Sequence, residues 1–426
     1  MVYYSDNQES FIMSEKQVVN IGIIGLGSRT ETLLFSILQM SDVKIAAICD
    51  LKQERIDKIL EILSGKVDTP KVYRNYRELL DDPEVEAVFI PTSWNSHLQI
   101  ARDSMKKGKY AAIEVGGASS IEELWQLVHA SEETRVSCMM LENCCYGRDE
   151  LLVLNMVRQG LFGELIYCEC GYEHYLGKEM AEEYLSGLER CRHNLRRNGD
   201  LYLTHGLGPV AKILNINRGN RFLSVSSHAT KARGFSLAVK KHANIDGIRF
   251  NEGDIITTII RCANGENITI THGVSLPRPY TRNCRIQGTN GIWLENAGGI
   301  YIEGISPCVE KRDPSGSISE THEWSPVESF YEKYDHPIWK KYKDKVASGR
   351  RGYDILTLEA FIDSVRNRTE TPINVYDCAA WMSITTLSEQ SVALGGAPVP
   401  CPDFTNGKWI YTAAKNTSFW SLDEVK

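Results

Sequence analysis

The first third of the chain alternates short apolar runs with amphipathic segments. The apolar runs predict strands at Val18–Gly25, Lys44–Asp50, Lys71–Tyr73, Ala87–Thr92, Tyr110–Val115 and Ser137–Asn143. The segments between them predict helices at Arg29–Met40, Gln53–Leu63, Tyr76–Leu80, His97–Lys107 and Ile121–Glu133. Buried strands that alternate with helices are typical of a parallel, doubly wound sheet. The pattern therefore predicts a six-stranded Rossmann domain over residues 18–143.

The pattern changes after residue 143. A helix is expected at Arg148–Gln159, and alternating apolar and polar positions then predict strands at Gly163–His174, Arg221–His228, Asp254–Cys262, Asn267–Val274, Asn283–Gly288 and Gly291–Glu295. Late helices are expected at Tyr353–Asn367 and Asp377–Leu394, and a surface loop at Lys311–Glu320. We thus expect an α/β fold whose second, α+β substrate domain (144–376) has an open, mainly antiparallel sheet. A C-terminal helix and tail (377–426) should pack back on the core.

Composition and charge exclude several classes of protein. The chain has 426 residues and a formal net charge of −7, whereas a nucleic-acid binder carries a strongly basic face. It lacks an uncharged apolar run of about 18 residues, so we expect no membrane partner. The segment before Val18 lacks the apolar region of a secretory signal, which predicts a cytoplasmic protein whether translation starts at Met1 or at Met13.

The twelve cysteines are scattered and include no CxxC pair. Reduced thiols in a cytosolic protein are the better interpretation of this pattern, and buried small side chains account for most of them. No cluster of His, Cys and Asp has the sequence spacing of metal ligands, so no metal is predicted.

A glycine-rich turn follows the first predicted strand and opens the first predicted helix. It reads Gly25-Leu26-Gly27-Ser28-Arg29, and Asp50 ends the next strand 23 residues after Gly27. In this context the turn is the dinucleotide fingerprint, in which the glycines let the backbone approach the pyrophosphate at a helix N-terminus. An acid at the position of Asp50 binds the ribose hydroxyls and repels a 2′-phosphate, which favours NAD over NADP. An empty, degenerate Rossmann domain is the alternative.

Two further loops follow strands whose carboxyl ends should line the cofactor crevice. Trp94, Asn95, Ser96 and His97 follow the fourth strand, and Glu114 and Val115 follow the fifth. We expect these residues to contact the cofactor, although His97 by itself is more typical of a polar residue at a helix start. Glu114 could equally be a solvated acid at a strand end.

The order of these motifs, followed by an open antiparallel sheet, resembles the Gfo/Idh/MocA superfamily of NAD(P)-dependent sugar oxidoreductases. In its dehydrogenases the tripeptide after the fifth strand is Glu-Lys-Pro, and its lysine assists hydride transfer from a hydroxyl. Val115 stands at the lysine position here, which argues against an ordinary dehydrogenase.

More specific stretches occur at 138–146 (CMMLENCCY), 198–210 (NGDLYLTHGLGPV), 214–219, 277–280, 334–337 and 395–399. With these stretches the chain resembles glycoside hydrolase family 109, the NAD-dependent α-N-acetylgalactosaminidase-like enzymes, over about Asn20–Trp409. It departs from the family at Thr30, where glycine is common, and at Gly116 and Leu203, where proline is common. Many family members also carry a twin-arginine export signal, which this sequence lacks.

The resemblance implies a glycosidase in which NAD takes hydride from C3 of the sugar and later returns it, with elimination and water addition between. Tyr202 and His205 are three residues apart, so on a helical turn both point into one site. We take His205 as the catalytic acid or base because imidazole changes charge near neutral pH, and Tyr202 as a proton donor or partner of the C3 hydroxyl. The resemblance also places Tyr172, Arg192, Leu203, Thr204 and Tyr280 at the sugar and Asn143 beside the nicotinamide ribose.

Several alternatives stay open at this point. The basic stretch around Arg192 could be a solvated face or a subunit contact, and Tyr202 could be a buried core residue. The protein could be a true NAD-dependent sugar or cyclitol dehydrogenase, or a catalytically idle NAD-binding sensor. We expect a small-molecule glycoside or glycan end as substrate, and a homo-oligomer because an open sheet face commonly becomes a subunit interface.

Overall fold

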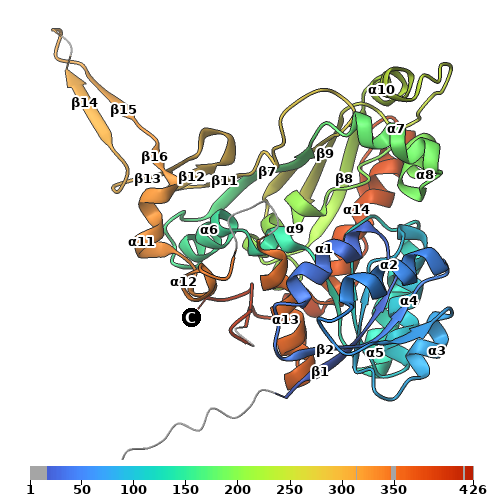
Figure 1. Cartoon of the computed structure of the whole chain (residues 1–426). Helices are drawn as coiled ribbons and strands as arrows, with labels where there is room; N and C mark the ends of the chain where they lie inside the picture. The colour runs from blue at the N-terminus through green and yellow to red at the C-terminus, as the bar shows by residue number, and fades with distance from the viewer. Residues whose placement is uncertain (1–16, 313, 347–351, 416–417, 426) are drawn as a thin grey trace, which may run out of the picture.

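The computed structural model describes residues 17–312, 314–346, 352–415 and 418–425. The candidate start Met13 lies outside them. The N-terminal part is a six-stranded parallel sheet with strand order β3-β2-β1-β4-β5-β6, which confirms the Rossmann prediction (Figure 1). Its strands are β1 (Val19–Ile24), β2 (Val43–Cys49), β3 (Lys71–Tyr73), β4 (Ala87–Ile90), β5 (Tyr110–Ile113) and β6 (Cys138–Met140).

Helices connect these strands as the periodicity predicts. They are α1 (Ser28–Ile37), α2 (Gln53–Leu63), α3 (Tyr76–Asp81), α4 (Trp94–Lys106) and α5 (Ile121–Thr134). Thr30, which replaces the usual glycine, is fully buried, and its hydroxyl donates a hydrogen bond of 2.6 Å to the Gly25 carbonyl oxygen. The larger residue therefore fits at this position because its polar atom closes the turn.

The second domain is built on a nine-stranded sheet with the order β16-β13-β12-β11-β7-β10-β9-β8-β17. It is mainly antiparallel, as predicted, although β7 and β10 pair in parallel. Its strands are β7 (Leu165–Glu173), β8 (Phe222–Ala229), β9 (Ile256–Cys262), β10 (Asn267–Gly273), β11 (Arg285–Gly288), β12 (Gly291–Leu294), β13 (Gly299–Ile302), β16 (Ser325–Pro326) and β17 (Val399–Pro400).

The remaining helices join this sheet to the first domain or lie at its edges. They are the 3₁₀ helix η1 (Asn143–Tyr146), α6 (Arg148–Arg158), α7 (Gly177–Ser186), α8 (Glu189–Arg196), α9 (Thr204–Ile213), α10 (Gly234–Ala243), η2 (Glu295–Ala297), η3 (Val327–Phe330), α11 (Tyr331–Tyr334), α12 (Pro337–Tyr342), α13 (Asp354–Asn367), α14 (Val375–Ala393) and η4 (Lys408–Ile410). No helix among the described residues is long and apolar enough to cross a membrane. All twelve cysteines lie in the described part of the chain as free thiols, and all but Cys308 are buried.

The segment predicted as a surface loop at 311–320 is exposed but forms part of a hairpin. Strands β14 (Cys308–Arg312) and β15 (Ile318–His322) pair antiparallel and extend away from the rest of the molecule (Figure 1). Hydrophobic patterning does not predict these strands because both faces of the hairpin are exposed, so no apolar alternation is required.

Helix α14 lies between the two domains. It packs against β8 of the large sheet and against α5 of the Rossmann domain, while α13 packs against α1 and β1. The C-terminal part of the chain therefore returns to the Rossmann domain, and α14 contacts both cores at once.

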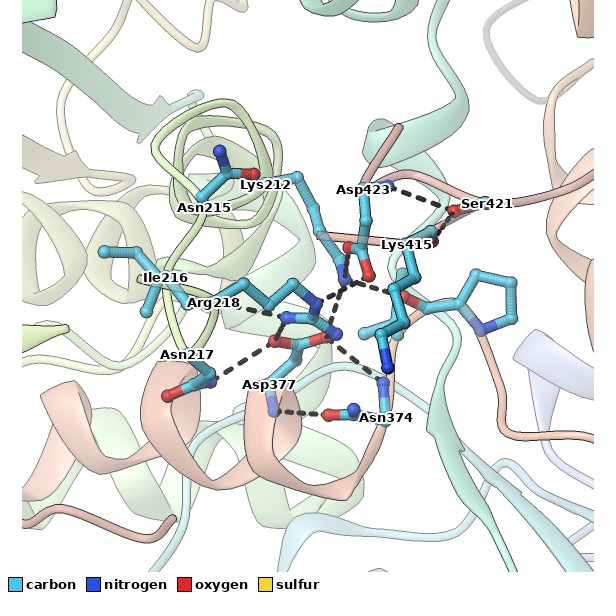
Figure 2. A network of polar contacts seen from close by, with 12 residues as sticks. Lys212, Asn215, Ile216, Asn217, Arg218, Asn374, Asp377, Lys415, Ser421 and Asp423 are labelled. Atoms are coloured by element: carbon cyan, nitrogen blue, oxygen red, sulfur yellow. Dashed lines mark hydrogen bonds and ion pairs between the residues drawn. The ribbon is translucent and has the colours of Figure 1, made fainter. Parts of the chain in front are cut away.

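A buried network of charges fixes the C-terminal tail to this arrangement (Figure 2). Asp377 on α14 accepts hydrogen bonds from Lys212 (2.7 Å) and from Arg218 (2.7 and 3.0 Å). Asp423 in the tail accepts from the same two cations at 3.0 and 2.6 Å. Two carboxylates thus balance two cations, which offsets the desolvation of all four groups.

We expect Asp377→Asn to lower the free energy of unfolding by about 3–5 kcal/mol, because it leaves a buried positive charge without its counter-charge. Burial by itself raises the pKa of Asp377. The charges of Arg218 and Lys212 lower it by more than burial raises it, so the pKa lies well below its ordinary value. Because the folded-state pKa is depressed, the contribution is present above about pH 4 and is lost as the pH falls through the folded-state value. Urea unfolding at pH 7 and pH 3 measures both effects.

The matched control is Asp246→Asn, since Asp246 pairs with Lys240 at an exposed site. It should leave the unfolding midpoint nearly unchanged. An equal loss in both variants would show that the buried network does not stabilise the fold.

Candidate functional site

Two adjoining cavities lie at the carboxyl edge of the Rossmann sheet, and Pro91 and Thr92 line both. The first, of about 570 Å³, is lined by residues that include Gly25, Gly27, Asp50, Arg55, Arg74, Tyr76, Arg77 and Ser96. The second, of about 730 Å³, is lined by residues that include Ser28, Arg29, Trp94, Glu114, Val115, Asn143, Arg190, Tyr202 and His205. Cavities at this edge of an α/β sheet, where the strand order reverses between β1 and β4, are where such folds bind dinucleotides.

The 570 Å³ cavity is lined by the glycine-rich turn and by Asp50, the residues expected to bind the adenosine half of a dinucleotide. Gly25 has φ +97°, and a Cβ there would lie 2.7 Å from the Thr92 methyl carbon, so only glycine suits this turn. A Cβ on Gly27 would meet no described atom within 4 Å, which leaves its backbone open to a phosphate. Asp50 accepts hydrogen bonds from the backbone amides of Leu26 (2.7 Å) and Lys52 (2.9 Å), so its carboxylate is held at the cavity wall.

The 730 Å³ cavity contains a charge cluster drawn from four distant segments. Arg29 donates to Glu114 (2.6 Å) and to Asp354 (2.8 Å), and the Asn143 amide donates to Asp354 (2.5 Å). Burial lowers the pKa of Arg29 but both carboxylates raise it more, and burial raises the pKa of Glu114 although Arg29 opposes this. The cluster holds Arg29, Glu114 and Asn143 in place at the wall of this cavity.

The four residues predicted to form a loop after β4 are instead the first turn of α4; two of them line the cavities and two point elsewhere. Trp94 stacks on Tyr202 with ring centroids 5.8 Å apart, and Ser96 lines the first cavity. Asn95 is exposed and donates to Glu189. His97 is fully buried in α4 outside the lining of both cavities, and burial lowers its pKa to about 4, so it is a neutral core residue.

Tyr202 and His205 face one another at the end of the second cavity. Their ring centroids are 5.1 Å apart, and the ring of Tyr172 on β7 lies 4.9 Å from Tyr202 and 5.5 Å from His205. Tyr280 packs edge-on against Tyr172 at 6.0 Å. Burial raises the pKa of Tyr202 to about 12, although the positive charge of His205 opposes this, so its hydroxyl keeps its proton at neutral pH.

His205 forms a buried ion pair that no sequence motif predicts. Its Nδ1 lies 2.7 Å from Oε1 of Glu142, which is fully buried just after β6 and also accepts the Cys144 amide hydrogen at 3.1 Å. Burial lowers the pKa of His205, but the Glu142 carboxylate raises it well above its ordinary value. The imidazole therefore rests as a cation, and its side chain lines the cavity.

Glycines in the THGLGP stretch allow this pairing. A Cβ on Gly206 would lie 2.7 Å from the backbone nitrogen and oxygen of Gly171, and a Cβ on Gly208 would lie 2.9 Å from Cγ of Glu142. Helix α9 therefore lies closer to β7 and Glu142 than it could if Gly206 or Gly208 carried a side chain. This contact brings His205 to Glu142 and places Tyr172 beside both.

Arg190, rather than Arg192, lines the cavity. The side chain of Arg192 is exposed, whereas Arg190 pairs with Glu183 on α7 and lies close to Tyr172 and Tyr202. Leu203 and Thr204 are buried in the backbone turn that precedes and opens α9. The family resemblance placed Arg192 at the sugar, whereas the structure places Arg190 of the same basic stretch at the cavity.

A second buried group of titratable residues lies behind Tyr172. His272 on β10 is 3.3 Å from Glu252 and 4.0 Å from Asp200, and its ring stacks with Tyr172 at 6.5 Å. Burial raises the pKa of Asp200 to about 6, although the charge of His272 opposes this. These residues are far apart in sequence, and no motif links them.

Two known protein families match most of this chain. Residues 19–142 match the oxidoreductase family with an NAD-binding Rossmann fold, and residues 146–411 match the glycosyl hydrolase 109 C-terminal domain. An α-N-acetylgalactosaminidase of Tannerella forsythia is 41% identical over 92% of this chain and 88% of its own length. One from Shewanella oneidensis is 38% identical over 93% and 87%.

Solved structures share the fold at low sequence identity. A scyllo-inositol dehydrogenase of Lactobacillus casei, with bound NAD(H) and scyllo-inositol, superposes with a TM-score of 0.62 at 14% identity, covering 90% of this chain and 99% of that one. A levoglucosan dehydrogenase in complex with NADH gives 0.64 at 15% identity, covering 91% and 100%.

We expect Asp50→Ala to weaken NAD binding by about 10- to 100-fold, because hydrogen bonds to a charged group contribute about 1.5–3 kcal/mol. Binding of NADP should weaken less or improve, since Arg55, Arg74 and Arg77 line the same cavity and lose the opposing carboxylate. Calorimetric titration with both cofactors measures the ratio. Asp57→Ala, a change at an exposed position on α2, is the control. An unchanged ratio of NAD to NADP affinity in Asp50→Ala would show that Asp50 does not bind the ribose.

We also expect Glu142→Gln to lower the pKa of His205, because it removes the carboxylate that stabilises the imidazolium. The measurement is an NMR pH titration of histidine labelled at Cε1. His336, whose pKa burial alone lowers to about 4, serves as the internal control and should not move. If the His205 signal titrates identically in both proteins, the ion pair does not set its charge.

Proposed function

Because this chain belongs to glycosyl hydrolase family 109, we propose that it is a glycosidase that hydrolyses α-N-acetylgalactosaminyl or related glycosides with NAD as a recycled cofactor. The observation that carries the proposal is the position of the His205–Glu142 pair and Tyr202 at the end of the cavity that fits the nicotinamide half of NAD. A redox-neutral reaction needs the sugar held between the bound cofactor on one side and His205 with Tyr202 on the other.

Bound NAD would supply reversible uptake of hydride from C3 of the sugar; with loss of the C3 hydroxyl proton to the protein this gives a C3 ketone, which makes the proton on C2 acidic. The protein must then hold the C3 oxygen, accept the C2 proton and donate a proton to the departing group at C1. Each task calls for a side chain at the cavity whose protonation state suits it.

His205 is suited to proton donation. It rests as an imidazolium because Glu142 holds its charge, and proton loss to a departing oxygen leaves a neutral imidazole that still hydrogen-bonds Glu142. Glu142 fixes the ring so that Nδ1 carries a proton and Nε2 faces the substrate, in the way that a buried carboxylate orients a catalytic histidine.

Two tyrosines and Arg190 complete the proposed sugar site. Tyr202 keeps its proton and stacks on Trp94, so it can donate a hydrogen bond to the C3 oxygen beside the cofactor. Burial raises the pKa of Tyr172, although the charges of His205 and Arg190 oppose this, as they do at Tyr202. The Tyr172 ring lies 5.5 Å from the His205 ring and 4.9 Å from the Tyr202 ring, so we assign acceptance of the C2 proton to Tyr172, with Arg190 stabilising the enolate.

The assay uses p-nitrophenyl α-N-acetylgalactosaminide with a panel of other glycosides, and records phenol and free NADH together. We expect many turnovers of phenol with no net NADH, because hydride returns to the same sugar. Net NADH in proportion to product would instead show a sugar dehydrogenase. A lack of phenol from every glycoside, with NAD bound, would favour an idle NAD-binding protein.

We expect His205→Asn to lower kcat by about 10²- to 10⁴-fold, the contribution of a positioned general acid, while NAD remains bound. Because the neutral amide would leave Glu142 without a counter-charge, the matched control is the double change Glu142→Gln with His205→Asn, which removes both charges. Both variants should be inactive and the double variant should be the more stable. Full activity in either folded variant would show that His205 is not the general acid.

A further inference from the structure

Three side chains at the site form a possible metal-ligand set, and one of them, Cys144, has no part in the proposed hydrolysis. The carboxylate of Glu142, the thiol of Cys144 and the imidazole of His205 each offer one ligand atom, and the three atoms lie within 4.8 Å of one another. Glu142 and Cys144 are buried, and His205 reaches the 730 Å³ cavity. No sequence pattern predicts the cluster because Glu142 and His205 are 63 residues apart.

The local backbone holds these groups in place. Glu142 caps η1, and its Oε1 accepts the amide hydrogen of Cys144 at 3.1 Å while it pairs with Nδ1 of His205 at 2.7 Å. Its second oxygen, Oε2, faces the Thr204 hydroxyl, yet no described group gives it a hydrogen bond of ordinary geometry. A buried carboxylate oxygen that is incompletely satisfied can accept a further positive partner.

The chemistry of the set matches a borderline divalent cation. One nitrogen, one sulfur and one oxygen are the ligand types that bind Zn²⁺, with bond lengths of about 2.0–2.3 Å that place ligand atoms roughly 3.3–3.8 Å apart. A carboxylate and a thiolate also neutralise the double charge of the ion, which a buried site requires. The donors therefore need only small shifts to close around one ion.

We propose that Glu142, Cys144 and His205 bind Zn²⁺ or a similar cation, and that the bound ion inhibits the enzyme by occupying the proton donor. The inhibition rests on the role proposed for His205, whereas the binding does not. The ion displaces the Nδ1 proton that His205 shares with Glu142, so the imidazolium is lost together with the Glu142 contact that orients Nε2 toward the substrate.

A neighbouring cation does not oppose this site strongly. Arg282 lies near Cys144, but its guanidinium contacts Glu150 and lies 3.7 Å from Glu295, so carboxylates offset its charge. The described residues contain one other cluster of this kind, Cys308, Glu320 and His322 on the hairpin β14–β15. All three are exposed, which makes that cluster a matched control.

The experiment titrates the full, NAD-loaded protein with Co²⁺, which reports thiolate ligation by a near-ultraviolet charge-transfer band, and then displaces it with Zn²⁺. We expect one Co²⁺ per chain with this band in the native protein and in Cys308→Ser, and loss of the band in Cys144→Ser. Turnover in the absence of metal should persist in Cys144→Ser. Its inhibition by Zn²⁺ should be weaker by about 10- to 100-fold or more, since even outer-shell partners of a metal contribute that much.

The outcomes separate this proposal from the proposed function. Absence of the band, or its loss only in Cys308→Ser, would overturn the buried metal site while leaving the glycosidase assay unaffected. A band that depends on Cys144 together with turnover that Zn²⁺ does not change would overturn the inhibition and, with it, the role of His205. Equal Zn²⁺ inhibition of the native and Cys144→Ser proteins would also overturn the proposal, because the ion would then act elsewhere.

Discussion

A buried ion pair joins His205 of the second domain to Glu142 at the end of the Rossmann sheet, and it constrains how the two domains meet. Removing two charges from water costs several kcal/mol each, and tight geometry with further hydrogen bonds offsets that cost. The Cys144 amide supplies one of those bonds. The two domains must therefore dock in a single way, because any other arrangement leaves a buried charge unmatched.

That docking is achieved by backbone contact rather than by large side chains. Gly206 and Gly208 let α9 lie directly against β7 and Glu142, and α14 packs on both domains. The charge network around Asp377 then fixes the end of the chain to the same helix, as Figure 2 shows. The position of the proposed catalytic histidine thus depends on contacts spread over most of the chain.

The two adjoining cavities differ in what shapes them. The cavity around Asp50 is lined by residues of the Rossmann domain and shaped by backbone turns, whereas the cavity around His205 is shaped by side-chain charges and aromatic rings. Pro91 and Thr92 line both cavities, and Trp94, which starts α4, stacks on Tyr202 in the second. A cofactor bound along both cavities would therefore end beside the residues proposed to hold the sugar.

Local patterns in the chain were sufficient to predict the Rossmann domain, the cofactor turn and the pairing of Tyr202 with His205. The first two features depend on periodicity and on glycine conformations. Tyr202 and His205 do lie together, but Tyr202 precedes α9, so one helical turn does not account for the pair. Position after the fourth strand suggested His97 and the family resemblance suggested Arg192, whereas the folded protein buries His97 and brings Arg190 into the cavity. Which side chains pair across the cavities became visible only once the chain was folded. Such pairs join segments far apart in the chain, and their energies depend on burial and distance, which no local pattern reports.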